Sequence, residues 1–335
     1  MKLVLFGLAL LGMVTTISAI SLTTVLKEVF RKEREAFKAE YGKVYSSSAE
    51  EEFRMNIFLD NRAYIAKHNR LAHQGHYSFF LKMNQWGDIQ YQIDKFSMNG
   101  VRMDEGNNKT LKSGATFIIP EGFKAPTELD WRTKGAVTEV KNQQPFKCAS
   151  CWSFSVTGSL EGQHYRKTGK LVSLSEQQLI DCNTANYGCD GGNMNLAFQY
   201  IQHNHGLDTE GSYPYQAKNE TCKFKPSSVG ATDKGFVAVP ANEEALGMAV
   251  AAIGPISVGI DASGRSFLFY HHGIYNKSGC TKVLMNHAVL LVGYGPGYWL
   301  VKNSFGPKWG DEGYIKIAKG RNNCGIDSWA TYPLV

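Results

Sequence analysis

The spacing of apolar residues predicts a helix early in the chain. From Ser46 onward, apolar side chains recur at intervals that place them on one helical face: Phe53, Ile57, Phe58, Tyr64 and Ile65. Serines 46 to 48 offer N-caps, and Glu50 to Glu52 fall in the first turns, where the helix dipole favours acidic groups.

A second pattern, late in the chain, predicts a β-hairpin. His287 to Tyr294 is almost continuously apolar, which is typical of a buried strand, and Gly295-Pro296-Gly297 follows as a turn. Tyr298 to Asn303 reads as the returning strand. A tight turn brings the outer ends of two strands together, so we expect His287 and Asn303 to be neighbours although they are 16 residues apart.

The composition is that of a folded protein with two units. The 335 residues are 43% hydrophobic and 20% charged, which excludes a wholly disordered chain. The formal net charge is +6, but the basic residues are scattered, so we expect no nucleic-acid partner. Gly106 to Ile119 loses its periodicity, which predicts an exposed linker between a helical front part and a back part.

The first residues predict a secretory route. A basic start, an apolar run from Leu3 to Val14 and a small residue at Ala19 fit a signal peptide over residues 1–19. The alternative is a membrane anchor, but the run is too short for a hydrocarbon core of about 30 Å, and we expect no membrane partner. The compartment should permit disulfides. Three sequons are candidate glycosylation sites: Asn108, Asn219 and Asn276.

All seven cysteines lie beyond residue 147, and an odd number leaves one thiol unpaired. Counting alone does not choose among the pairings of the other six, and the unpaired thiol could be buried and inert, join another chain or act as a nucleophile. The stretch from Cys148 to Cys151 leads into a predicted helix, whose N-terminus stabilises a thiolate. A zinc site is the rival use of this CxxC, but no second ligand pair has finger-like spacing, so we expect neither metal nor cofactor.

A nucleophilic thiol needs an imidazole to move its proton, and the imidazole needs an orienting partner. Of nine histidines, His287 has the most suggestive setting, because an Asn303 carbonyl accepting from one ring nitrogen would leave the other for the thiol. Together with the helix-terminal thiol, they predict a Cys–His–Asn site of nucleophilic catalysis.

With these residues identified, the chain resembles a papain-family cysteine peptidase proenzyme of the cathepsin L group. The resemblance rests on Cys151, His287 and Asn303, and on two propeptide motifs in the front part. The first comprises Glu50, Arg54, Phe58, Asn61, Ile65 and Asn69, whose spacings of 4, 4, 3, 4 and 4 follow one helical face. The second comprises Asn84, Trp86 and Asp88.

The resemblance implies an α+β, papain-like two-domain fold with a helical left domain and a β-barrel-like right domain, preceded by a helical inhibitory propeptide. The propeptide would span residues 20–124 and the peptidase domain residues 125–335. The implied disulfides are Cys148–Cys189, Cys182–Cys222 and Cys280–Cys324, leaving Cys151 free. The implied protein is a lysosomal or secreted monomer. Its expected partners are peptide and protein substrates, its own propeptide and cystatin-like inhibitors.

The resemblance also assigns roles in an endopeptidase that forms a thioester. Cys151 would be the nucleophile, His287 the acid and base, Asn303 the orienting residue, and Gln143 the side-chain donor of the oxyanion hole. Gly191 and Gly192 match the strand where substrate backbone pairs with the enzyme. Four residues, Met194, Gly259, Met285 and Ala288, are expected to line the pocket for the P2 side chain.

Four departures from the family pattern bear on activity. Two extra residues separate Gln143 from Cys148, Ala149 stands where a glycine is usual, and Phe305 replaces a tryptophan over the Asn–His contact. Trp329 stands where relatives have a small residue at the far end of the P2 pocket, which predicts altered P2 selectivity. The alternatives are a weakened or inactive homologue that binds peptides or inhibitors, and a ligase that passes the same thioester to an amine.

Overall fold

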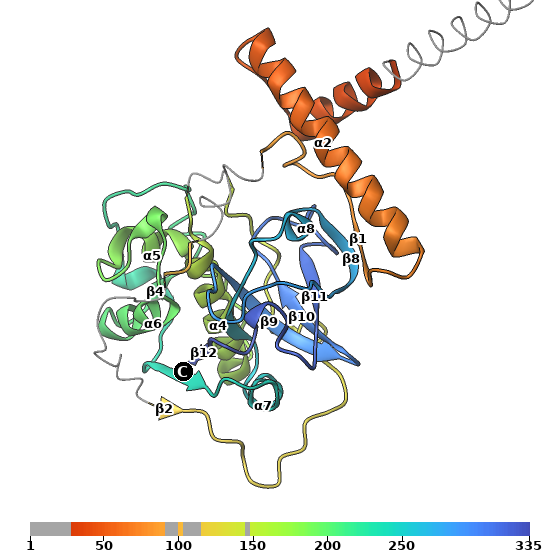
Figure 1. Ribbon diagram of the computed structural model, residues 1–335. Helices are drawn as coiled ribbons and strands as arrows, with labels where there is room; N and C mark the ends of the chain where they lie inside the picture. The colour runs from red at the N-terminus through yellow and green to blue at the C-terminus, as the bar shows by residue number, and fades with distance from the viewer. Residues whose placement is uncertain (1–27, 91–99, 103–114, 145–147) are drawn as a thin grey trace, which may run out of the picture. The chain divides into compact units, whose positions relative to one another are not determined.

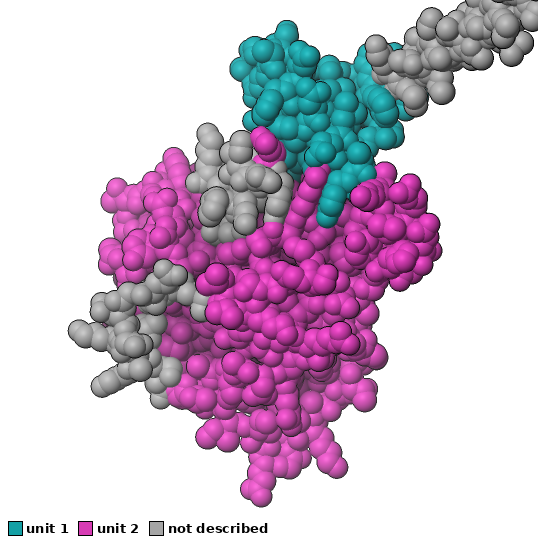
Figure 2. Space-filling model, viewed as in Figure 1, with its two compact units in different colours: residues 1–64, 85–89 teal, residues 65–84, 90–335 magenta. Residues whose placement is uncertain are grey.

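The computed structural model describes residues 28–90, 100–102, 115–144 and 148–335. The chain divides into two compact units (Figure 2). Unit 1 comprises Met1–Tyr64 and Gln85–Ile89, and unit 2 comprises Ile65–Asn84 and Gln90–Val335. The predicted signal peptide lies outside the described residues.

Unit 1 is built from a helix over residues 28–41 and the first part of α2 (Ser48–His73). The Ser47 hydroxyl accepts from the backbone N–H of Glu50, as an N-cap does, so the predicted helix and its start are confirmed. The two helices meet through Phe37 and Phe58, whose ring centroids are 5.0 Å apart. Phe53 shares the predicted spacing but is 52% exposed, so it is not part of this core.

Two residues of the second propeptide motif, Trp86 and Asp88, pack within unit 1. Asn61 on α2 donates to the backbone carbonyl of Gly87 at 2.8 Å, and the Asp88 carboxylate receives Lys43 Nζ at 2.8 Å. Trp86 is only 2% exposed. These contacts give Trp86 and Asp88 a packing role within this unit, whereas Asn84 belongs to unit 2 and donates to Leu268 O at 2.8 Å.

Helices and strands of unit 2 separate into two groups (Figure 1). The long helix α4 (Cys151–Thr168) runs through the core, with α5 (Glu176–Cys182) and α6 (Met194–His203) beside it. Strand β9 packs against α4 from the other group. The remaining helical segments are η1 (Gly188–Asp190), η2 (Pro226–Ser228), α7 (Glu243–Ile253), α8 (Arg265–Leu268) and η3 (Asn323–Gly325).

Among the described residues, ten strands form one sheet in the order β1-β8-β11-β10-β9-β7-β12-β6-β2, with β3 also paired to β9. A second, two-stranded sheet pairs β4 with β5. The bounds are β1 Phe79–Leu81, β2 Ala115–Thr116, β3 Leu129–Asp130, β4 Leu207–Asp208, β5 Val229–Ala231, β6 Phe236–Val239, β7 Ile256–Ile260, β8 Tyr270–Tyr275, β9 His287–Gly295, β10 Tyr298–Lys302, β11 Tyr314–Ala318 and β12 Ala330–Pro333.

The predicted linker is partly ordered into the sheet. Residues 103–114 lie outside the described ranges, but β2 pairs in parallel with β6, and Phe117 is only 6% exposed. The expectation of an exposed linker up to Ile119 is therefore wrong at Phe117. The sequence lacks a strand pattern there because β2 has only two residues, too few to show periodicity.

Three disulfides join Cys148 to Cys189, Cys182 to Cys222, and Cys280 to Cys324, and Cys151 is a free thiol. These are the pairs that the resemblance implies. No helix in the described part of the chain is both long enough and apolar enough to span a membrane. Within the same residues, no group of three or more His, Cys, Asp or Glu side chains is arranged to hold a metal ion.

Candidate active site

Cys151 is the first residue of α4 and its side chain is fully buried. Two backbone N–H groups point at its sulfur, from Gly100 at 3.4 Å and from Ala288 at 3.5 Å. Burial raises the pKa of the thiol to about 11, although these N–H groups oppose the shift. The sulfur is therefore a neutral thiol while Gly100 lies over it.

His287 opens β9 and Asn303 follows β10, so the hairpin brings them together as predicted. His287 Nε2 lies 2.8 Å from Asn303 Oδ1, and because an amide oxygen only accepts, Nε2 carries the proton. The other ring nitrogen, Nδ1, is buried with no hydrogen-bond partner among the described residues. Burial lowers the pKa of His287 to about 4, against the effect of Asn303.

Aromatic rings shield this pair from water. Phe305 is 2% exposed, and its ring centroid lies 5.0 Å from that of His287. Trp309 packs edge-on against Phe305 at 5.6 Å. Phe305 thus covers the Asn303–His287 bond, as the family's tryptophan is expected to do, with a smaller ring and no indole N–H.

Gln143 is fixed by its backbone N–H and by its side-chain oxygen. Its backbone N–H donates to the Ser304 carbonyl at 2.8 Å, and its Oε1 accepts from the Ser304 hydroxyl at 2.6 Å. Gln143 Nε2 is buried and has no partner within the described ranges. A buried, unpaired amide donor is costly unless something binds to it, which suits a donor kept for an oxyanion. Residues 145–147 of this lengthened loop lie outside the described part.

Residues 100–102 pair with Gly192 as an additional strand would, and they pass close to Gly191. Gly192 N–H donates to Gly100 O at 2.7 Å, Arg102 N–H donates to Gly192 O at 3.0 Å, and Val101 forms a parallel bridge with Gly192. A Cβ on Gly191 would lie 2.6 Å from Gly100 O, and one on Gly192 would lie 2.6 Å from the Trp152 ring. Gly191 therefore requires glycine for the approach of another backbone, and Gly192 requires it because the Trp152 ring packs against it.

The approach is closest above the nucleophile. A Cβ on Gly100 would lie 1.7 Å from the backbone oxygen of Ala149, a separation that real atoms do not reach. Ala149 itself is 7% exposed, with its N–H bonded to Cys189 O at 2.8 Å. Only glycine fits at position 100, because any side chain would push this segment off Cys151.

The residues expected around the P2 side chain form one apolar group. Met194 and Ala288 belong to the same buried cluster, and Trp329 packs against it. Gly259 donates its N–H to Trp329 O at 2.9 Å, and a Cβ on Gly259 would lie 3.1 Å from Met285 Cβ and 3.5 Å from the Trp329 ring. The missing side chain at Gly259 therefore leaves room for its two large neighbours.

Buried charges lie behind the site. Lys302, next to Asn303, donates from Nζ to the Thr138 backbone oxygen at 2.8 Å, and the Thr138 hydroxyl donates to Glu161 at 2.6 Å. Lys141 Nζ binds Glu161 at 3.1 Å and Glu176 at 2.7 Å. Burial alone would raise the pKa of Glu161, but the two lysines hold it below its ordinary value. Lys141 is ion-paired with both glutamates, and the two oxygens of Thr138 accept from the buried Lys302.

Sequence reasoning missed two contributors, Gly100 and Ser304. Nothing in the sequence around Gly100 distinguishes it from other isolated glycines. Its role follows only from its contacts with Ala149 and Cys151, which are distant in sequence. Ser304 orients Gln143 through its hydroxyl and also donates its N–H to Asn303 Oδ1 at 2.8 Å. Its position directly after Asn303 is the one signal that could have suggested a role.

Comparison with known proteins agrees with this geometry. The papain family cysteine protease model matches residues 125–334, and the cathepsin propeptide inhibitor domain (I29) model matches residues 35–92. The chain is 48% identical over 340 residues to a cathepsin L-like peptidase of Aedes aegypti, covering 97% of this chain and 98% of that protein. It is 46% identical to procathepsin L of Mus musculus, covering 93% and 95%.

A solved structure, digestive procathepsin L 3 from the larval midgut of Tenebrio molitor, superposes with a TM-score of 0.83 at 38% identity. The match covers 91% of this chain and 99% of that one. The fold, the propeptide domain and the relatives together place the chain in the papain family of cysteine peptidases, as a cathepsin L-like proenzyme.

Proposed function

We propose that this proenzyme is activated in acid by loss of the residues before Ala125 and then cleaves internal peptide bonds, with the four catalytic roles assigned above. The observation that carries the proposal is the pairing of His287 with Asn303 at 2.8 Å in the same buried site as the unpaired thiol of Cys151. The protein would work in a lysosome or a secreted lumen, where substrates and cystatin-like inhibitors meet it.

Catalysis would proceed in two proton-balanced stages. The Cys151 proton passes to His287 Nδ1, the sulfur attacks the substrate carbonyl, and His287 returns the proton to the leaving amine. Water then attacks the thioester, with His287 taking its proton, and the acid product leaves as the thiol is restored. Gln143 Nε2 and the Cys151 N–H would hold the negative oxygen in both stages.

Inhibition by residues 100–102 follows from their direction and their contacts. They pair in parallel with Gly192 and place Gly100 against the Cys151 sulfur. With the thiol pKa at about 11 and the His287 pKa at about 4, both groups are neutral between these values, and no thiolate is present to attack. Removing the segment would admit water and substrate to both groups.

Selectivity at P2 would be set by Trp329. Its ring packs on the cluster that contains Met194 and Ala288, which supports a pocket shortened by the indole. A hydrophobic pocket of this kind discriminates by size, by about 10- to 200-fold for a single misfit. We therefore expect a preference for smaller P2 side chains.

The test is acid activation of the secreted proenzyme, followed by labelling with an epoxide that alkylates papain-family thiolates. Mass spectrometry locates the adduct, and fluorogenic peptides that differ at P2 report turnover. We expect an adduct on Cys151, none in Cys151→Ala, and turnover that favours small P2 residues.

Propeptide loss with neither label nor turnover would contradict the proposal. It would indicate the alternative, a homologue that binds peptides or inhibitors, which the altered loop after Gln143 favours. Product analysis with an added amine distinguishes hydrolysis from ligation, since a ligase would give amide products.

A further inference from the structure

The hydroxyl of Tyr215 lies between the two segments that supply the proposed oxyanion donors. It donates to the backbone carbonyl of Gln143 at 3.0 Å. It also bonds to the Ser150 hydroxyl at 2.7 Å, and since its own proton goes to Gln143, Ser150 is the donor in that bond. Ser150 immediately precedes Cys151, whose N–H is the second proposed oxyanion donor.

The Ser150 side chain bonds to Tyr215 and does not cap its helix. It is the N-cap residue of α4, a position where serine side chains usually accept from the first-turn N–H groups. Here the side chain makes no such cap bond, and its hydroxyl goes to Tyr215 instead. Ser150 is fully buried, so its orientation is fixed by the structure around it.

Tyr215 is itself held by two contacts, one of its backbone and one of its ring. Its backbone N–H donates to Glu210 Oε1 at 2.9 Å. Its ring packs edge-on against Phe154, one turn along α4 from the nucleophile, with centroids 4.9 Å apart. Burial raises the pKa of Tyr215, so the hydroxyl keeps its proton and remains a donor over the enzyme's working range.

We propose that Tyr215 is a positioning residue for the oxyanion hole, which sets the separation between Gln143 and the start of α4 by bonding to both. The inference rests on the oxyanion role proposed above for Gln143. The chain between Gln143 and Cys148 carries the extra residues, so it fixes this separation less tightly than a shorter connection would. A single hydroxyl bound to both segments supplies the constraint.

The test is Tyr215→Phe in the full proenzyme, activated and assayed beside wild type. Because small displacements of a catalytic donor are costly, we expect kcat to fall about 10-fold with KM within about twofold. Affinity for a peptide aldehyde, whose adduct places an oxyanion in the hole, should weaken by a similar factor. Alkylation of Cys151 by iodoacetamide forms no oxyanion, so its rate should not change.

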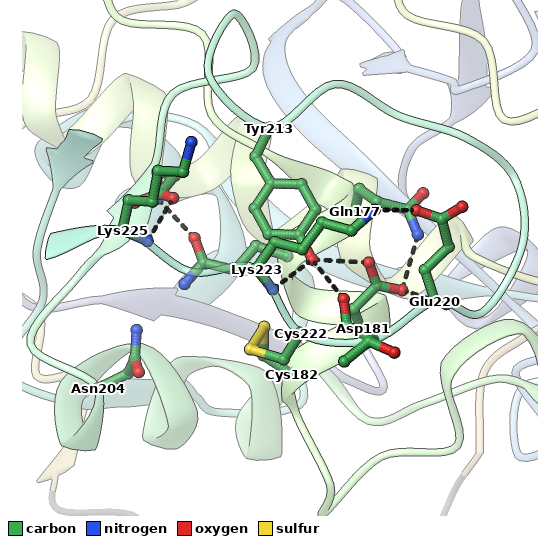
Figure 3. Close-up of a disulfide and its surroundings, with 12 residues drawn as sticks. Gln177, Asp181, Cys182, Asn204, Tyr213, Glu220, Cys222, Lys223 and Lys225 are labelled. Atoms are coloured by element: carbon green, nitrogen blue, oxygen red, sulfur yellow. Dashed lines mark hydrogen bonds and ion pairs between the residues drawn. A yellow bond between two sulfur atoms is a disulfide. The ribbon is translucent and has the colours of Figure 1, made fainter. Parts of the chain in front are cut away.

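Tyr213→Phe is the matched control, because Tyr213 is on the same loop with a different task. Its hydroxyl donates to Asp181 at 2.7 Å and accepts from Lys223 N–H at 3.0 Å, near the Cys182–Cys222 disulfide (Figure 3). We expect Tyr213→Phe to lower the unfolding temperature but leave kcat unchanged. In a Gln143→Ala background, Tyr215→Phe should add less than about twofold, because the donor it positions is gone.

Three results would overturn the inference: unchanged kcat in Tyr215→Phe, an equal loss of kcat in Tyr213→Phe, or a loss of iodoacetamide reactivity equal to the loss of kcat. If wild type itself is labelled by neither reagent and turns nothing over, the proposed function fails and the positioning role fails with it. An active wild type beside an unaffected Tyr215→Phe overturns the positioning role alone.

Discussion

The two sides of the proposed active site are held by different kinds of contact. His287 and Asn303 lie at the ends of β9 and β10, which are joined by a tight turn and a ladder of backbone hydrogen bonds with one bulge. Cys151 lies at the start of α4 and is reached through a loop. At the described ends of that loop, Cys148 is joined to Cys189, and the Tyr215 hydroxyl bonds to Gln143 and Ser150.

The difference shows where substitutions can be tolerated. A backbone ladder does not depend on side-chain identity, so the strand side keeps its geometry when Phe305 stands in for a larger ring. The helix side depends on a few side chains that are distant in sequence. We therefore expect changes on the strand side to act mainly through the chemistry of the altered group, and changes on the helix side to act through its position.

The largest effect should come from the strand side, where His287 is the proposed acid and base. His287→Ala removes both the acid and the base, so we expect kcat/KM to fall by about 10⁴-fold. His203→Ala, exposed at the end of α6, is the control and should leave the rate unchanged. Steady-state assays with one fluorogenic peptide measure both, and a loss below about 10-fold would exclude His287 from the reaction.

Gln143→Ala tests the helix side directly. Losing one oxyanion donor typically costs about 10²- to 10³-fold in kcat, and KM should change little. Gln144→Ala is the matched control, because the neighbouring amide is the second candidate for the same role and should cost far less. A larger loss in Gln144→Ala would mean that the extra residues have shifted the role by one position.

Removal of residues 100–102 should activate the thiol by about 100-fold or more. Burial holds the Cys151 pKa at about 11 in the proenzyme, which leaves roughly one thiol in 10⁴ ionised at pH 7. Iodoacetamide alkylation of intact and processed protein, followed between pH 4 and 8, measures the difference. Equal rates would show that Gly100 does not seal the sulfur.

Acid should itself favour opening of the covered site. The buried His287 has a pKa of about 4, below its usual value of about 6.5, so an exposed His287 takes up a proton in this window that the covered form does not. The covered state therefore loses stability as pH falls from about 6.5 to 4. In the unprocessed wild-type protein, the rate of Cys151 alkylation should therefore fall less steeply below pH 6 than the ionised fraction of the thiol does.

Trp329→Gly should shift P2 selectivity by about 10-fold toward large side chains, because removing the indole lengthens the pocket. The ratio of kcat/KM for peptides with Phe and Val at P2 reports the shift. Gly259→Ala is the opposing variant, since its Cβ would lie 3.1 Å from Met285 Cβ and should disfavour large P2 residues further. An unchanged ratio in Trp329→Gly would place the indole outside the pocket.

The smallest effect concerns stability on the helix side. Asp233 lies in a turn that is tied to α6 by the bond from Gln202 to Lys234 O at 2.9 Å, and burial raises the Asp233 pKa to about 8. An unfolded aspartate has a pKa near 3.9, so the folded state holds an extra proton between about pH 4 and 8 and loses stability as pH rises through that window.

Asp233→Asn should therefore reduce the loss of unfolding free energy between pH 5 and 8 by about 4 kcal/mol. Urea unfolding of enzyme with its thiol alkylated, which prevents autolysis, gives the two values. Glu244→Gln, exposed on α7, controls for the lost charge. An identical pH dependence in wild type and Asp233→Asn would contradict the assignment.

Local patterns predicted the elements that carry the site. The helical spacing around Phe58, the apolar run after His287 and the glycine turn that follows are properties of neighbouring residues, so α2 and the β9–β10 hairpin could be read from them. The hairpin in turn placed His287 against Asn303, because a turn fixes the register of its two strands. The odd cysteine count indicated a free thiol, and the resemblance to the papain family identified it as Cys151.

Contacts between distant parts of the chain could not be read in the same way. Counting alone could not decide how the six cysteines pair. The short strands β1 and β2 have too few residues to show a periodic pattern. The closeness of Gly100 to Cys151, of Ser304 to Gln143, and of Tyr215 to Ser150 arises only when segments far apart in sequence pack together.

The sequence by itself therefore determined the helices after Ser46 and Cys151, the hairpin and the types of residue available for chemistry, because periodicity and turn residues act locally. Tertiary structure decided which backbone covers the thiol, how the Gln143 amide is oriented and which hydroxyl bridges the oxyanion segments. These depend on packing over long separations, where burial and hydrogen bonding at each position are set by residues that the local pattern does not contain.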